Sequence, residues 1–244
     1  MNYMKRILIL FAFAVLLGTP AMAQLKTKVA TQTQHYALSE GSKWGLDVDL
    51  SVEYVVSSGS KTVTEKINKG IASHIFGPNF KGTIPEMLKQ YAEAAAKEYR
   101  EENKEVPADA LTNWKQTGAA KFVDSFGSMI TYEVVSVYDN GTSHPMMNKT
   151  CTVFNTKTGE PVSVESLFLP GYDATLTPLI QKYKYYAMNE KNRYFENTII
   201  SNNNFMVTPR GIVFVYNPYD IAPYDNGIIH ITVPWSELKS ILVK

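Results

Sequence analysis

The stretch Phe205–Leu238, FMVTPRGIVFVYNPYDIAPYDNGIIHITVPWSEL, decides the fold of the last third of the chain. Residues 208–211 carry Pro second and Gly fourth, as a type I turn prefers, and join two short apolar strands. Residues 212–216 are apolar on both faces, which predicts a central strand that is covered on both sides. Residues 228–233 form the next strand, and Pro234 is expected to open a short terminal helix.

The connection NPYDIAPYDNG at residues 217–227 allows two interpretations. Its prolines push the preceding residues toward extended geometry, and residues 225–227 have turn chemistry, so it is a stiff link that caps the sheet. Alternatively it is a binding loop, in which tyrosine rings stack on a sugar beside acidic groups. The candidate binding residues of this loop are Tyr219, Asp220, Tyr224 and Asp225.

Two further residues join the candidate binding set. His144 follows the turn at residues 139–141, so we expect it at a loop tip, where binding groups concentrate, although a structural role is also open. Trp235 offers a third aromatic ring for a glycan. Both are candidate binding residues, as are those of the loop at residues 217–227.

Short strands begin at Lys115. Turns at residues 127–128 and 139–141 separate alternating segments, and Asn140-Gly141 tolerates the positive φ of a tight primed turn. The pattern predicts an antiparallel meander, followed by a helix that starts at residues 177–178.

The preceding part combines one strand with two helices. Residues 45–56 alternate apolar and polar side chains, which is typical of a half-exposed strand. Capping boxes at Thr62/Glu65 and Thr83/Glu86 predict the starts of two amphipathic helices. The separate blocks of helices and strands predict an α+β fold, with antiparallel sheets packed with helices in two subdomains. The predicted subdomains are residues 25–115 and 116–244.

Residues 1–23 have the features of a secretory signal peptide. Lys5 and Arg6 precede an apolar core at residues 7–17, and a small-residue cleavage site ends at Ala23. We therefore expect a periplasmic or secreted protein that is not inserted in a membrane after cleavage.

Composition narrows the classes of partner. The chain has 24 Lys and Arg against 23 Asp and Glu, a net charge of +1, and no basic stripe. This argues against a nucleic-acid partner. The single cysteine, Cys151, excludes an internal disulfide, and its strand-like neighbours favour a buried thiol over a nucleophile.

No catalytic residue, metal site or cofactor is predicted. The four histidines form no recognised ligand spacing, and the chain lacks the G-x-S-x-G, P-loop and dinucleotide motifs. Asp47 and Asp49 share one exposed strand face, so the same solvent surrounds both and their pKa values are not split as an acid–base pair requires.

The C-terminal stretch resembles the RsiV/PdaC-type extracellular domain family. Residues 218–224 and Gly227 match its Pro-Tyr-acid-Ile-Ala-Pro-Tyr signature, and TGEPVSVESLF at residues 158–168 is similar to its lead into a short helix. Gly141 and His144 match part of its Gly-Gly-Ala-His motif, of which the second Gly and the Ala are missing here. The resemblance covers about residues 115–244 as an RsiV-like domain, and the part before it resembles the PdaC-like partner domain only in layout.

In that family the domain is the lysozyme-sensing part of an anti-sigma factor or the non-catalytic front of peptidoglycan deacetylases. The resemblance therefore implies a non-catalytic binding module of the bacterial cell envelope, whose partner is a lysozyme-like muramidase or a cell-wall glycan. One alternative is an envelope hydrolase or deacetylase, which requires His144 to meet Asp220 and Asp225 in one cleft. Another is a structural envelope protein that has a surface patch and no small ligand.

Overall fold

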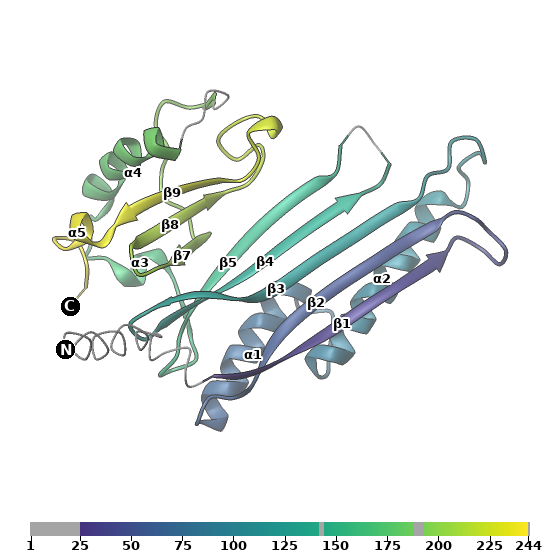
Figure 1. Cartoon of the computed structure of the whole chain (residues 1–244), viewed down its shortest axis with the longest axis horizontal. Helices are drawn as coiled ribbons and strands as arrows, with labels where there is room; N and C mark the ends of the chain where they lie inside the picture. Colours follow the sequence, from purple (N-terminus) through teal and green to yellow (C-terminus); the bar gives the residue numbers. More distant parts are fainter. Residues whose placement is uncertain (1–24, 142–143, 188–192, 244) are drawn as a thin grey trace, which may run out of the picture.

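The computed structural model describes residues 25–141, 144–187 and 193–243, and it has the predicted α+β fold (Figure 1). The predicted signal peptide lies outside these ranges. Within them, no helix is both long enough and apolar enough to cross a membrane. A six-stranded sheet and a three-stranded sheet form the two halves of the molecule.

The six-stranded sheet has its strands in chain order. They are β1 (Lys26–Ala37), β2 (Gly45–Ser57), β3 (Trp114–Phe126), β4 (Met129–Asp139), β5 (Met146–Asn155) and β6 (Pro161–Val162). All neighbours are antiparallel except β2 and β3, which run parallel. The parallel pair needs a long crossover, and two helices supply it: α1 (Lys61–Phe76) and α2 (Ile84–Asn103). Both helices lie behind the sheet in Figure 1.

The alternation predicted for the strand at residues 45–56 is confirmed by β2. Its apolar side chains are buried and pack with the helices, whereas Asp47 and Asp49 are exposed on the opposite face. The main apolar residues of this first core are Leu46, Val48, Leu50, Val52, Ile67, Ile71, Leu88 and Ala92.

Only one of the two predicted helix starts is confirmed. The Thr83/Glu86 capping box begins α2, with the Thr83 amide donating to Glu86 Oε2 at 2.7 Å. The start predicted at Thr62 is wrong, because Ser60 is the N-cap of α1 and its hydroxyl accepts from the Val63 amide. Two capping residues stand close together in this sequence, so the local pattern did not separate them.

The second sheet has the strand order β7-β8-β9. Its strands are β7 (Phe205–Val207), β8 (Gly211–Tyr216) and β9 (Ile229–Pro234). As predicted, β8 is central, and all six of its residues are buried. Helix α4 packs against β9, and the short helices α3, α5 and η2 complete this half. Their bounds are α3 (Val164–Leu167), α4 (Asp173–Ala187), η2 (Tyr224–Asn226) and α5 (Trp235–Leu238).

The start predicted for α4 at residues 177–178 is wrong. The helix begins at Asp173, so Pro178 lies inside it. The amides of Thr175 and Leu176 both donate to the Tyr172 carbonyl, which closes the first turn upstream of the proline.

The two hydrophobic cores meet across β5. Successive side chains of a strand point to opposite faces, and here Phe154 joins the first core while Val153 joins the second. Strands from both sides of the expected boundary at residues 115/116 share the six-stranded sheet. The physical division between the cores thus lies at β5, within the predicted C-terminal subdomain.

Candidate functional site

The loop at residues 217–227 and the tip of the β4–β5 hairpin reach the same end of the molecule (Figure 1). The His144 and Tyr224 rings stack there, with centroids 3.9 Å apart and an interplanar angle of 18°. The Tyr219 hydroxyl lies 3.4 Å from His144 Nε2, and its ring centroid lies 5.9 Å from that of Tyr224. We call these three residues the aromatic surface.

Hydrogen bonds from side chains of this loop to backbone groups tie it to the hairpin. The Tyr224 hydroxyl donates to the Pro145 carbonyl. Asn217 Oδ1 accepts from the Lys149 amide at 2.7 Å. The aromatic surface is therefore anchored on β5 from both ends of the loop.

Tyr219 has a strained backbone. Its φ of 73° makes it the one non-glycine residue with positive φ in the part of the chain that the structure describes. Its amide donates to the Ala222 carbonyl at 3.0 Å, and the Asp220 amide donates to the Asn217 carbonyl at 3.0 Å. The left-handed conformation costs about 1–2 kcal/mol for an L-residue. Burial of the ring does not explain this cost, because Tyr219 is 50% exposed.

The two aspartates do not join the aromatic surface. Asp220 Oδ2 accepts from the Asn217 amide at 2.7 Å, so this carboxylate holds the loop in shape. Asp225 is exposed in η2. Across the described ranges, no hydrogen bond or ion pair joins His144 to either carboxylate. The hydrolase alternative, which needs His144 beside these carboxylates, stays a prediction.

Trp235 lies at the opposite end of β9 from the loop. Its ring stacks on Phe126 with centroids 4.4 Å apart, and its indole nitrogen donates to the Thr208 carbonyl at 2.8 Å. Both polar and apolar parts of this side chain are engaged in packing. Trp235 thus joins the end of β3 to the second sheet, and its role in binding stays a prediction.

Two exposed residues that the sequence reasoning missed follow His144 and Pro145 in the chain. Met146 and Met147 follow Pro145 directly and are 48% and 37% exposed. Methionine adapts its shape to irregular partners and is common on surfaces that bind proteins. The consecutive methionines after His144 were the available signal.

At the junction of the two sheets, two charged side chains pair with each other and a buried thiol stays protonated. Glu133 and Lys149 form an ion pair of 2.6 Å, and each side chain is only 14% exposed. Burial raises the pKa of the adjacent Cys151 thiol to about 12, which keeps it protonated. The expectation of a buried structural thiol is confirmed, because a nucleophile needs the thiolate.

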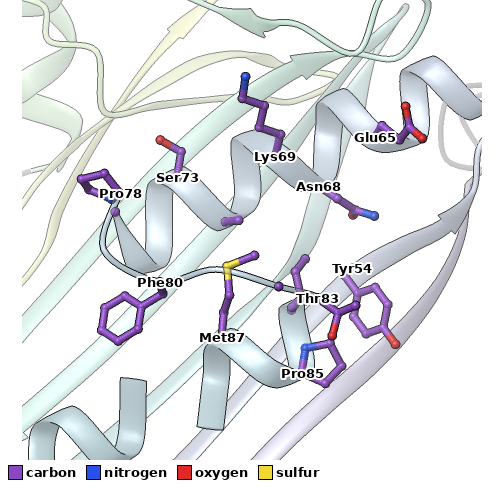
Figure 2. A pocket seen from close by; sticks show the side chains of 14 residues that line it. Tyr54, Glu65, Asn68, Lys69, Ser73, Pro78, Phe80, Thr83, Pro85 and Met87 are labelled. Atoms are coloured by element: carbon purple, nitrogen blue, oxygen red, sulfur yellow. The ribbon is translucent and has the colours of Figure 1, made fainter. Parts of the chain in front are cut away.

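A groove of about 810 Å³ lies between α1 and α2. Figure 2 shows Phe80 and Met87 on one side of it and Asn68 and Ser73 of α1 on the other. Lys69 points away from Met87. No residue of the segment 215–235 lines this groove.

Comparisons with known proteins place this fold. Residues 165–236 match the model of a family described as "Protein of unknown function (DUF3298)". A crystal structure of a DUF3298 family member from Bacteroides fragilis is 19% identical, with a TM-score of 0.80 over 90% of this chain and 94% of that one. A DUF3298 family protein from Pseudomonas aeruginosa is 12% identical, with a TM-score of 0.64 over the same shares. No curated protein matches the chain. The chain thus has the fold of solved DUF3298 proteins, and its residues 165–236 match that family's model.

Proposed function

We propose that this protein is an exported, non-catalytic binding module of the bacterial cell envelope that docks its partner on the aromatic surface. The observation that carries the proposal is Tyr219, which is held in a strained conformation while half of its surface stays exposed. Strained residues persist where the surrounding structure fixes them, and they cluster at functional sites.

The shape of the surface favours a macromolecular partner. Half of Tyr219 is exposed, which leaves its ring free for contact with a large partner. Exposed apolar side chains that lie together are typical of sites for proteins, and Tyr219 is 50% exposed beside the rings of His144 and Tyr224. The resemblance to lysozyme-sensing domains makes a lysozyme-like muramidase the first partner to test. Aromatic rings also suit sugars, so a cell-wall glycan is the second.

Calorimetric titration of the purified protein with a muramidase, and separately with peptidoglycan fragments, tests the proposal. Truncation of a central aromatic anchor costs more than 1 kcal/mol, so we expect Tyr219→Ala to weaken binding about tenfold or more. Leu169→Ala is the control, because Leu169 is similarly exposed, at 46%, and lies outside the surface. If neither the muramidase nor the peptidoglycan fragments bind, both proposed partners are ruled out. If Tyr219→Ala binds as tightly as the unaltered protein, the docking surface lies elsewhere.

A further inference from the structure

Two hollows on the helix-covered side of the six-stranded sheet adjoin one another. Their volumes are about 400 Å³ and about 290 Å³, and both are lined by Tyr91, Gln116 and Ser136. The Gln116 side chain donates to the Tyr91 hydroxyl at 3.0 Å, which places this hydrogen bond where the hollows meet. We call the pair the sheet–helix cleft, because residues of α1 and α2 line it on one side and residues of β2, β3, β4 and β5 on the other.

The larger hollow is walled by aromatic rings. They come from Phe80, Tyr91, Trp114 and Tyr138. Trp114 and Tyr138 meet edge to face at 5.6 Å and 83°, and Phe80 and Tyr91 do so at 5.7 Å and 61°. Ring faces carry partial negative charge, so an aromatic wall attracts cations.

One ionised group accompanies these rings. Glu98 is the single Asp, Glu, Lys or Arg among the residues that line the two hollows. It forms no ion pair within the described ranges. Burial, then Glu102 and Glu98, raises the pKa of the Tyr138 hydroxyl to about 12, so both carboxylates act on the ring that walls the hollow. The aromatic end of the cleft is therefore negative and has no cation of its own.

The smaller hollow is neutral and offers hydrogen-bonding groups above an apolar floor. His74 Nε2 lies 2.8 Å from the Thr150 hydroxyl, and burial lowers the pKa of His74, which favours its uncharged form at neutral pH. Gly118 leaves space in this hollow, because a Cβ at this position would lie only 3.0 Å from Leu50 Cδ2. Asn148 also lines this hollow. This end therefore suits an apolar body or an uncharged polar group.

We propose that the sheet–helix cleft binds a small organic cation, with its ammonium group among the aromatic rings beside Glu98 and its apolar body toward Gly118. The volumes of the two hollows are of the size that small ligands occupy. The combination of aromatic faces with an unpaired carboxylate selects positive charge, because no group of the cleft repels it. This site is separate from the aromatic surface, and the proposal does not rest on the function given above.

Three probes with the same phenylethyl framework test the charge preference: phenethylamine, 2-phenylethanol and phenylacetate. Binding to the purified protein at neutral pH is measured by calorimetry and by the shift of the Trp114 indole NMR signal. A cation–aromatic contact next to an exposed carboxylate predicts binding of phenethylamine about fivefold tighter than of the neutral alcohol. Phenylacetate should bind most weakly.

Two variants locate the site, and one controls for charge. Glu98→Gln keeps the shape of an exposed side chain and should bring the amine and the alcohol within about twofold of each other. Ala94→Leu adds bulk to the wall of the larger hollow and should weaken both probes. Glu105→Gln removes an exposed carboxylate that does not line the cleft, and should keep the preference. No binding of any probe, equal binding of amine and alcohol, an unchanged preference in Glu98→Gln, or unweakened binding in Ala94→Leu would each overturn the proposal.

Discussion

The strands within each sheet are joined by backbone ladders, whereas the two sheets are joined to each other by side chains. Thr131 accepts from the Val207 amide at 3.0 Å and donates to the Val207 carbonyl at 3.2 Å. Asn204 accepts from the Cys151 amide and donates to the Lys149 carbonyl, both at 2.8 Å. Hydroxyl and amide groups thus make, at the junction, the bonds that a neighbouring strand makes inside a sheet.

The difference explains why the second sheet is separate. An open strand edge presents unpaired amides and carbonyls that another strand can join. At residues 149–151 of β5, side chains bond to the backbone groups of this edge. The side-chain amide of Asn204 bonds to Cys151 and Lys149, and that of Asn217 bonds to Lys149. The six-stranded sheet therefore does not continue into β7, and the second sheet forms on its own ladder with β8 and β9.

The largest expected effect comes from the core on either side of β5. Phe154 is fully buried, and its ring packs against Gly70 of α1. Phe154→Ala should lower the free energy of unfolding by about 3–5 kcal/mol, because it leaves a cavity in the first core. Val153→Ala should cost about 2 kcal/mol on the opposite face. Denaturant unfolding followed by both fluorescence and circular dichroism measures each value.

The same pair of variants tests whether the two cores unfold together. Both share β5, so we expect a single transition that shifts in each variant. Val56→Ala is the control, since Val56 is exposed and its loss should cost less than about 0.5 kcal/mol. Two transitions, of which each variant moves only one, would show that the halves are energetically independent.

A smaller effect is expected at the junction itself. Asn204→Ala removes both hydrogen bonds to β5 and leaves an amide and a carbonyl without their partners. Each lost partner costs about 1 kcal/mol or more, so the loss should be about 2 kcal/mol in urea unfolding. Asn79→Ala, in the exposed loop between α1 and α2, is the matched control. Equal stability of the two variants would mean that water replaces Asn204 at no cost.

The loop of the aromatic surface should give an effect of about 1 kcal/mol. Tyr219→Ala and Tyr219→Gly remove the same ring contacts, but only glycine adopts the positive φ of 73° without steric cost. The glycine variant should therefore be the more stable by about 1 kcal/mol in thermal or denaturant unfolding. If the alanine variant is as stable, the strain assigned to Tyr219 is absent.

Sequence periodicity predicted much of this architecture, because each element depends on its own residues. The alternation in β2, the Thr83/Glu86 capping box and the fully apolar β8 are local signals, and the structure confirms them. Turn chemistry likewise predicted a loop at His144, and the structure has this residue between β4 and β5.

Features that depend on residues far apart in the chain could not be predicted. Trp235 was grouped with the tyrosines by residue type, yet its partner Phe126 lies on β3, more than 100 positions away. The triplet Asn202-Asn203-Asn204 has the composition of a plain loop, although Asn204 closes the edge of β5. The sheet–helix cleft was missed for the same reason, since its walls come from β2, α1, α2 and the meander.

The smallest expected effect is on the pH dependence of stability. One histidine on the helix side, His74, and one at the junction of the sheets, His230, should each contribute to it. Burial lowers the pKa of His74, and partial burial together with the Lys149 cation lowers that of His230. In the unfolded chain a histidine has a pKa of about 6.5. As the pH falls through that value, the unfolded chain takes up these protons before the folded one, so the free energy of unfolding decreases. His74→Gln and His230→Gln should each flatten the decrease between pH 7.5 and 5, and the double variant should be flattest. Urea unfolding across this range measures the slopes, and a slope unchanged in the double variant would remove both histidines as its cause.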